Sequence, residues 1–205
     1  MLGWHYVAQP ALLVGHSMHP TLQSGDRVLV FKLVETAVGS WGRKLRRQDI
    51  VQCRNPGAPQ HLLIKRLIGL PGDRLTIRDR RVFINDVVLD EPYKRHDSRW
   101  MDQSDAVFPD ETRNVLAPTA FTMFDTWVRD GYLVVPPEHY FVLGDNRSTS
   151  QDSRLFGMVA SDDILGVVVL VAWSFDSYQC QRTSDAGGCA FRSFRSARIL
   201  LDPTR

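Results

Sequence analysis

The sequence has no long hydrophobic run. A transmembrane helix needs about 20 consecutive apolar residues, whereas the mildly apolar stretch at residues 1–15 is shorter and contains His5, Gln9 and Pro10. The chain also lacks a basic segment followed by an apolar one and a small-residue cleavage site, which is the pattern of a secretory leader. We therefore expect neither a membrane-spanning helix nor a leader within these 205 residues.

A large excess of charge is also lacking. The net charge is +2, whereas a nucleic-acid-binding domain presents a strongly basic face, so nucleic acid is not an expected partner. Lysine is scarce, because only four of the 25 basic residues are lysines: Lys32, Lys44, Lys65 and Lys94. Arginine stays charged at any accessible pH, but burial can make lysine neutral. A lysine within an apolar run is therefore conspicuous in this chain.

Cysteine is rare, with three in the chain. Cys180 and Cys189 flank a polar, glycine-containing stretch typical of a loop, and a disulfide between them would suit an oxidising, extracytoplasmic location. Two unpaired thiols are the alternative. Cys53 lies in or beside an expected strand, and no Cys/His spacing indicates a zinc site. We expect no metal and no cofactor.

Short apolar runs separated by turn residues dominate the chain and predict a mainly β protein. The expected strands are residues 28–31, 50–51, 75–77, 82–84, 87–89, 133–135, 140–143 and 166–173. The last of these is continuously apolar, as in a strand covered on both faces. Residues 91–131 contain several prolines and little alternation, which indicates an inserted cap subdomain. We therefore assign residues 1–90 and 132–205 to the catalytic core and 91–131 to the cap.

Three motifs carry chemistry. Residues 15–22 read GHSMHPTL, where proline and threonine turn the backbone just after Ser17. Residues 61–70 read HLLIKRLIGL and place Lys65 on one face of a strand with Leu63 and Leu67. Residues 144–154 read GDNRSTSQDSR, a turn-rich loop of charged and hydroxyl side chains. A serine, a desolvated lysine and a polar supporting loop together predict a hydrolase with a Ser17 nucleophile and a Lys65 base.

The lysine can accept a proton only when it is neutral. An unperturbed lysine has a pKa of about 10.4, so about one side chain in a thousand is neutral near pH 7.4. Burial in apolar surroundings can lower such a pKa by about 3 to 5 units. The apolar neighbours of Lys65 in the sequence are therefore sufficient to make it a base.

With these three motifs in order and spacing, the chain resembles the type I signal peptidases, which are Ser-Lys endopeptidases. The resemblance implies an antiparallel, barrel-like β catalytic core with a variable second subdomain. It also implies that the enzyme forms an acyl-enzyme while it removes signal peptides from secreted preproteins. The implied partners are these preproteins and a membrane lipid surface on the extracytoplasmic face. Relatives have an N-terminal membrane anchor, and this chain departs from them there.

The resemblance also implies roles for residues around the dyad. Ser150 corresponds to a serine that hydrogen-bonds the lysine amine. Gly15 stands where many members have a hydroxyl that stabilises the oxyanion, so a second N–H or a water must substitute. Pairing of Asp145 with Arg66, and of Asp152 with Arg154, would fix the third motif beneath the site. From the sequence itself, the apolar residues that flank the two catalytic residues could wall shallow substrate pockets: Leu13, Met18, Leu22, Leu63 and Ile64.

Two histidines flank the serine and offer a different base. If residues 15–19 are extended, successive side chains point to opposite faces, so His16 would point away from Ser17. His19 would share the face of Ser17 but immediately precedes the Pro20 turn. We therefore expect Lys65 to be the base.

Other readings of the motifs remain open. An organellar processing peptidase of the same superfamily would have the same catalytic residues. A self-cleaving SOS-type repressor would add an N-terminal DNA-binding domain and an internal cleavage site. A non-catalytic peptide-binding module would be expected to lose Ser17 or Lys65, and both are present.

Overall fold

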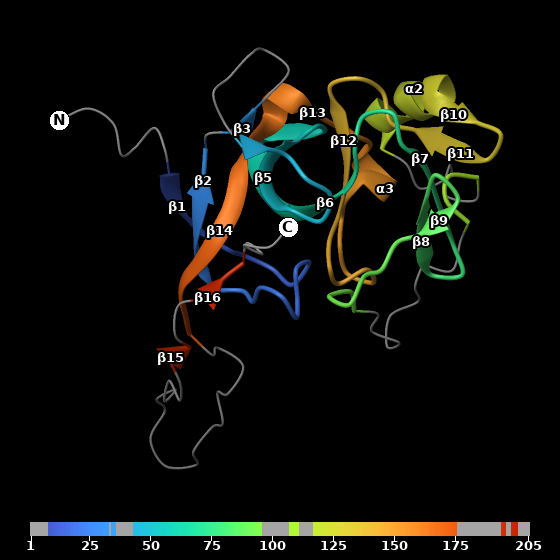
Figure 1. Ribbon diagram of the computed structural model, residues 1–205. Coiled ribbons are helices and arrows are strands. Elements are labelled where there is room, and N and C mark those ends of the chain that lie inside the picture. Colours follow the sequence, from blue (N-terminus) through green and yellow to red (C-terminus); the bar gives the residue numbers. More distant parts are fainter. Residues whose placement is uncertain are drawn as a thin grey trace.

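The computed structural model describes residues 8–32, 34–35, 43–95, 107–110, 117–175, 194–195 and 198–200. Two largely separate antiparallel sheets dominate it (Figure 1), which confirms the expected mainly β fold. Cys180 and Cys189 lie outside the described residues, so their disulfide stays a prediction. No helix in the described ranges has the length and apolar character that crossing a membrane requires.

The larger sheet contains the candidate site. Its strands run in the order β1-β2-β14-β5-β6-β12-β13, and β15 and β16 also pair with β14. Within the described residues these strands are β1 (Ala8–Leu12), β2 (Arg27–Phe31), β5 (Ile50–Asn55), β6 (Ala58–Gly69), β12 (His139–Leu143), β13 (Val159–Ala160), β14 (Ile164–Phe175), β15 (Phe194–Arg195) and β16 (Arg198–Ile199). A short parallel pair, β3 (Val34–Glu35) and β4 (Arg43–Lys44), lies outside this sheet.

Strand β14 explains why this sheet has hydrophobic residues on both faces. Val167 belongs to a buried cluster that includes Val51, Leu67 and Val142, whereas its neighbour Val168 packs in a second cluster on the opposite face. Alternating side chains that are all apolar can be buried only if both faces are covered. The continuous apolar run of the sequence is therefore a central strand, as expected.

The smaller sheet has the order β10-β11-β7-β8-β9. Its described strands are β7 (Arg74–Arg78), β8 (Arg81–Ile84), β9 (Val87–Val88), β10 (Val128–Arg129) and β11 (Tyr132–Val134). The two turns of the β7-β8-β9 meander each use two residues with positive φ, Asp79 with Arg80 and Asn85 with Asp86. Two consecutive residues with positive φ form the kind of turn that matches the twist of a two-residue β-hairpin. The expected hairpins are therefore present.

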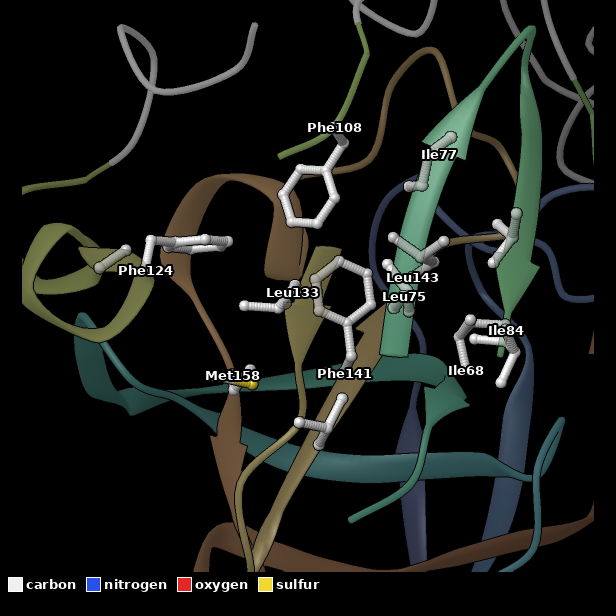
Figure 2. Close-up of a cluster of buried hydrophobic side chains, with 13 residues drawn as sticks. Ile68, Leu75, Ile77, Ile84, Phe108, Phe124, Leu133, Phe141, Leu143 and Met158 are labelled. Atoms are coloured by element: carbon white, nitrogen blue, oxygen red, sulfur yellow. The ribbon is translucent and has the colours of Figure 1, made fainter. Parts of the chain in front are cut away.

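Three helical segments complete the described fold: α2 (Pro118–Trp127), α3 (Ser153–Phe156) and the 3₁₀ turn η3 (Ser161–Asp163). The sequence reasoning missed α2. Its signals are a proline in the first turn and buried Ala120 and Phe124 four residues apart. Phe124 packs edge-on against Phe108, which in turn contacts Phe141 of β12 (Figure 2). This cluster joins the helix and the smaller sheet to the end of the larger one.

The division into a core and a cap at residues 91–131 stays a prediction, and the two sheets do not divide at those residues. The expected cap began at residue 91, but β7, β8 and β9 already belong to the smaller sheet, and β11 closes it after residue 131. The alternating pattern of residues 75–88 is equally compatible with either sheet. Only the pairing of β7 with β11, which are about 58 residues apart in the register Leu75↔Leu133, assigns these strands to the second sheet.

Candidate active site

Ser17 and Lys65 line the same pocket. It has a volume of about 600 Å³ and lies between β1 with the loop that follows it on one side and β6 on the other. Ser17 is half-buried in that loop, and Lys65 comes from the middle of β6. Residues 48 positions apart in the chain are thus brought together because β1 and β6 face each other across the pocket.

The Ser17 segment forms tight turns. The N–H of Leu22 donates to the Met18 carbonyl at 2.9 Å, and the N–H of His19 donates to the His16 carbonyl at 3.2 Å. The carbonyl of Ser17 accepts from the N–H of Asn146 at 2.9 Å, so the third motif holds the serine backbone directly. Within the described residues the N–H of Ser17 donates to no protein group, and it is available to an oxyanion.

These turns correct the sequence argument about the two histidines, which assumed that residues 15–19 are extended. His16 lines the pocket together with Ser17, so alternation does not turn it away. His19 has its Nδ1 3.2 Å from Nη1 of Arg95. The sequence reasoning assumed a strand, but the glycine at position 15 has φ +96° and starts a turn.

Lys65 is buried, with 4% of its surface exposed. Its cross-strand neighbour is Val51, and Cys53 pairs with Leu63 one step along the same face. Burial lowers the pKa of Lys65 below its ordinary value, because an ammonium loses its hydration there. The nearby Asp152 opposes the shift only in part. Burial also raises the pKa of the Cys53 thiol to about 12, so this neighbour is neutral.

The third motif is fixed by two ion pairs, and both of those suggested by the sequence are present. Arg66 donates from Nε and Nη2 to the two oxygens of the buried Asp145, at 2.7 and 2.5 Å. Arg154 donates to both oxygens of Asp152 at 2.9 and 3.0 Å. Burial by itself would raise the pKa of Asp152, but Arg154 and the N–H of Gly144 lower it below its usual range. Asp152 is therefore a carboxylate at neutral pH.

Ser150 lies in this loop close to Gly144 and Ser17, although it does not bond Lys65. Its hydroxyl oxygen is buried and has no hydrogen-bond partner among the described residues. A Cβ at Gly144 would collide with the Ser150 side chain and lie 2.5 Å from the carbonyl oxygen of Ser17. Glycine at position 144 therefore lets the Ser150 side chain and the Ser17 carbonyl pack closely against the backbone there.

Gly15 also lines the pocket, and its N–H is already used. It donates to the hydroxyl of Ser24 at 3.2 Å. With no side chain and an occupied N–H, Gly15 contributes no free donor to the pocket.

Sequence reasoning missed Glu91, which it placed at the start of the cap. Glu91 and Arg147 form a buried ion pair, and the Nε of Arg147 donates to the Gly144 carbonyl at 3.0 Å. The hydroxyl of Tyr93 donates to Glu91 at 3.2 Å, and the Arg66 guanidinium stacks 3.8 Å from the Tyr93 ring centre. The segment after β9, residues 91–95, therefore contacts the third motif and supports it. A buried glutamate beside a proline gave no signal in the sequence.

The pocket walls agree in part with the expected apolar set. Leu13, Leu63 and Ile64 line the pocket, whereas Met18 and Leu22 are fully buried in the core cluster beneath it. The turn after Ser17 directs these two side chains inward. Polar residues that were not anticipated also line the pocket: Gln9, Gln52, Thr149 and Gln151.

The described part of the chain contains no cluster of His, Cys, Asp or Glu side chains with the geometry of a metal site. The pocket is lined by the Ser17 hydroxyl, the buried Lys65 amine and the His16 imidazole, besides the polar side chains named above.

Comparison with known proteins identifies the family. Residues 1–173 match the model of the signal peptidase family, peptidase S26. Signal peptidase I U of Bacillus subtilis (strain 168) is 34% identical over 82% of this chain and 76% of its own length. Signal peptidase IB of Staphylococcus aureus (strain COL) is 29% identical over 85% of this chain and 82% of its own. A crystal structure of a signal peptidase I from Enterococcus faecalis V583 is 34% identical, with a TM-score of 0.42 over 62% of this chain and 97% of that one.

A mainly antiparallel β protein with a serine and a buried lysine in one pocket is consistent with a hydrolase. The chain belongs to the signal peptidase family, peptidase S26. The protein is a serine endopeptidase of the signal peptidase I type.

Proposed function

We propose that this enzyme removes N-terminal signal peptides from secreted preproteins at the extracytoplasmic face of the cell membrane. Ser17 is the nucleophile and neutral Lys65 is the general base. The observation that carries the proposal is the burial of the Lys65 amine in the pocket that Ser17 also lines, with its pKa lowered. A charged lysine could not accept the serine proton, and burial supplies the neutral form.

The reaction runs in two halves. Lys65 Nζ takes the proton of the Ser17 hydroxyl as Oγ attacks the scissile carbonyl, and the resulting ammonium then gives this proton to the departing amine. The signal peptide is left as an acyl ester on Ser17. Lys65 next takes a proton from water, which attacks the ester, and returns the proton to Ser17 Oγ as the signal peptide leaves.

The oxyanion of each tetrahedral intermediate needs hydrogen-bond donors. The free N–H of Ser17 is one, as in other serine enzymes in which the nucleophile's own amide contributes. The bond from Asn146 to the Ser17 carbonyl holds the next peptide unit, on the other side of the Ser17 Cα. Gly15 has no side chain, and its N–H already donates to Ser24. A water or another N–H therefore supplies the second donor.

The substrate binds as an extended strand along β6. Among the described strands, β12 pairs with β6 only through Arg66, Leu67 and Gly69, so residues 62–65 have a free edge on that side. A peptide added there places alternate side chains in the pocket. Leu13 and Ile64 make the wall nearest the serine shallow and apolar, which favours small residues one and three positions before the scissile bond.

The lipid surface is the second partner. Three apolar side chains at the pocket rim are exposed: Leu12 at 58%, Val14 at 80% and Leu62 at 50%. Val7 lies outside the described residues, and Leu13 is buried. Exposed apolar groups that gather beside a site mark a binding surface. Here they would contact the membrane in which the signal peptide's apolar segment lies.

The test is to incubate the protein with a signal-peptide-bearing preprotein in detergent and to read the new N-terminus by mass spectrometry. We expect one cleavage after an Ala-x-Ala sequence, and none with Ser17→Ala. Efficient cleavage after Phe or Lys at the −1 position would contradict the proposed substrate class. Unchanged cleavage by Ser17→Ala would contradict the nucleophile.

A further inference from the structure

The C-terminal segment, residues 198–200, lies beyond the part of the chain that the family model matches, which is residues 1–173. It returns to the larger sheet all the same. Strand β16 pairs with β14 in the register Val171↔Arg198 and Leu170↔Ile199, beside the lower part of β14 in Figure 1. Since β2 pairs with the other edge of β14, β16 occupies the edge that β5 leaves free. The segment therefore has a defined place in the catalytic sheet.

Alternation along this segment directs two of its side chains toward the core. Side chains that pair across neighbouring strands share a face, so Arg198 lies on the face of Val171, which belongs to the core cluster beneath the pocket. Leu200, two residues further on, packs against the same cluster. Ile199 is 77% exposed. The segment thus places an apolar side chain beneath residues 13–26, which we call the serine loop.

The side chain of Arg198 bonds the serine loop directly. Its Nη2 donates to the carbonyl oxygen of Thr21. This carbonyl and the N–H of Leu22 belong to one peptide unit, and that N–H donates to the Met18 carbonyl at 2.9 Å. Two hydrogen bonds in series therefore connect the Arg198 guanidinium to the residue that follows Ser17. Hydrogen bonds in such a chain polarise and strengthen one another.

Thr21 is held by a second bond, which comes from its side chain. Its hydroxyl donates at 2.5 Å to Oδ2 of Asp145, the carboxylate that Arg66 also bonds. The side chain of Thr21 thus joins the third motif, whereas its carbonyl joins the C-terminal segment. Neither Thr21 nor Arg198 lines the pocket. Any effect of Arg198 on the reaction is therefore exerted through the position of Ser17.

We propose that the C-terminal segment positions the serine loop, with Arg198 as a positioning residue for Ser17. The effect on cleavage rests on the proposed function, whereas the hold on the loop is a property of the folded enzyme alone. Leu200 anchors the segment in the core, and Arg198 fixes the turn that follows Ser17. Without the Arg198 donor the turn moves more freely, and Ser17 Oγ is aligned with Lys65 and the scissile carbonyl for a smaller fraction of the time.

Hydrogen exchange measured by mass spectrometry tests the hold on the loop without any substrate. Arg198→Met keeps the aliphatic part of the side chain and removes the donor. Because Arg198 is exposed, its bond competes with water, and we expect peptides from the serine loop to exchange about fivefold faster. Arg198→Lys retains a charged donor and should restore part of the protection. Arg81→Met, at an exposed arginine of β8, is the control and should leave the loop unchanged.

Steady-state cleavage of a preprotein with an Ala-x-Ala site tests the consequence for catalysis. Arg198→Met should lower kcat about fivefold and change KM less, because one hydrogen bond that acts on Ser17 is lost and the pocket walls are kept. Arg198→Lys should recover part of kcat. Leu200→Ala should also lower kcat, since the segment loses its anchor. Its matched control is Ile199→Ala, because Ile199 is the neighbouring residue but is exposed.

Unchanged exchange of the serine loop in Arg198→Met would overturn the inference and leave the proposed function standing. Faster exchange with an unchanged kcat would overturn the positioning role. A loss of kcat in Arg198→Lys or Arg81→Met as large as that in Arg198→Met would do the same, because the effect would not depend on the donor at position 198. An unaltered enzyme that cleaves no preprotein would overturn the proposed function, and hydrogen exchange would still decide whether Arg198 holds the loop.

Discussion

Burial of the Lys65 side chain lowers the stability of the native state. Its pKa is lowered mainly because burial removes the hydration of the ammonium. In the unfolded chain the same side chain titrates near pH 10.4. Between the lowered native pKa and about pH 10.4 the unfolded state binds more protons than the native state, so stability rises with pH across this window.

Replacing Lys65 by Met should therefore stabilise the protein while abolishing activity. We expect a gain of about 1 kcal/mol or more in the free energy of unfolding at pH 7, shrinking as the pH approaches about 10. Urea denaturation at several pH values measures this gain. Lys44→Met, at an exposed lysine, is the control and should change little. A loss of stability at pH 7 in Lys65→Met would show that burial of the amine does not destabilise the native state.

At the scale of elements, the third motif depends on the segment after β9. Arg95 donates its N–H to the Asp145 carbonyl and accepts from the N–H of Arg147, so this segment runs alongside residues 145–147 like an added strand. Glu91 neutralises Arg147 at its start. The loop that holds the Ser17 carbonyl is thus supported by residues outside all three motifs.

Glu91→Gln should destabilise the protein by about 3 to 5 kcal/mol, because it leaves the Arg147 guanidinium buried without a counter-charge. We also expect kcat to fall more than KM rises, since Asn146 of this loop holds the Ser17 carbonyl. Thermal unfolding and steady-state kinetics measure the two effects.

The matched control for Glu91→Gln is Asp86→Asn, which removes the exposed pair of Arg74 and Asp86 at 3.6 Å. Such a pair is worth less than about 1 kcal/mol. Equal effects of the two substitutions would show that the Glu91 pair is not a support of the loop. The double variant of Glu91→Gln with Arg147→Met should recover part of the lost stability.

How much could be predicted from the sequence depended on the range of the interactions. The β8–β9 turn at Asn85 and Asp86 was predictable because it is set by local backbone preferences. The ion pair of Arg66 with Asp145 joins residues 79 positions apart and was suggested only because the two lie in the second and third motifs. Whether β7 belongs to the first or the second sheet was not predictable, because it depends on pairing with a distant strand.

The errors had physical causes too. Helix α2 was missed because it is short and its apolar face has few residues, although Pro118 marks its start. Met18 and Leu22 were assigned to the pocket because they are close to Ser17 in the sequence, but the turn after Ser17 directs both side chains into the core. The contact of Gln9 with Gln52 was not predictable, because it requires the two strands between β1 and β5 to curve the sheet.

On the scale of the whole molecule, the exposed apolar rim of the pocket gives the protein a side that would face the membrane. Leu12→Ser with Val14→Ser should reduce sedimentation with phospholipid vesicles several-fold, because each change removes exposed apolar surface. Val87→Ser alters an equally exposed residue (68%) on the smaller sheet and should have little effect. Equal losses in both proteins would show that binding has no preferred side.

The disulfide between Cys180 and Cys189 remains a prediction about the chain as a whole. It would close a loop of about ten residues and stabilise the fold by about 2 to 3 kcal/mol. Cys53 is a free, buried thiol. The intact mass of the non-reduced protein after alkylation in denaturant should therefore show one modified thiol, whereas three modified thiols would exclude the bond.

The most direct test of the account is the pH dependence of kcat/KM for preprotein cleavage, measured for the unaltered enzyme and for Lys65→Ala, Lys65→Arg, His16→Ala and His19→Ala. We expect activity to rise with pH through the lowered pKa of Lys65, as the neutral amine becomes available. Both Lys65 variants should be folded and inactive, because alanine has no base and guanidinium stays protonated. Each histidine variant should retain most activity and the same pH profile. Turnover by folded Lys65→Ala, together with its loss in either histidine variant, would contradict the mechanism.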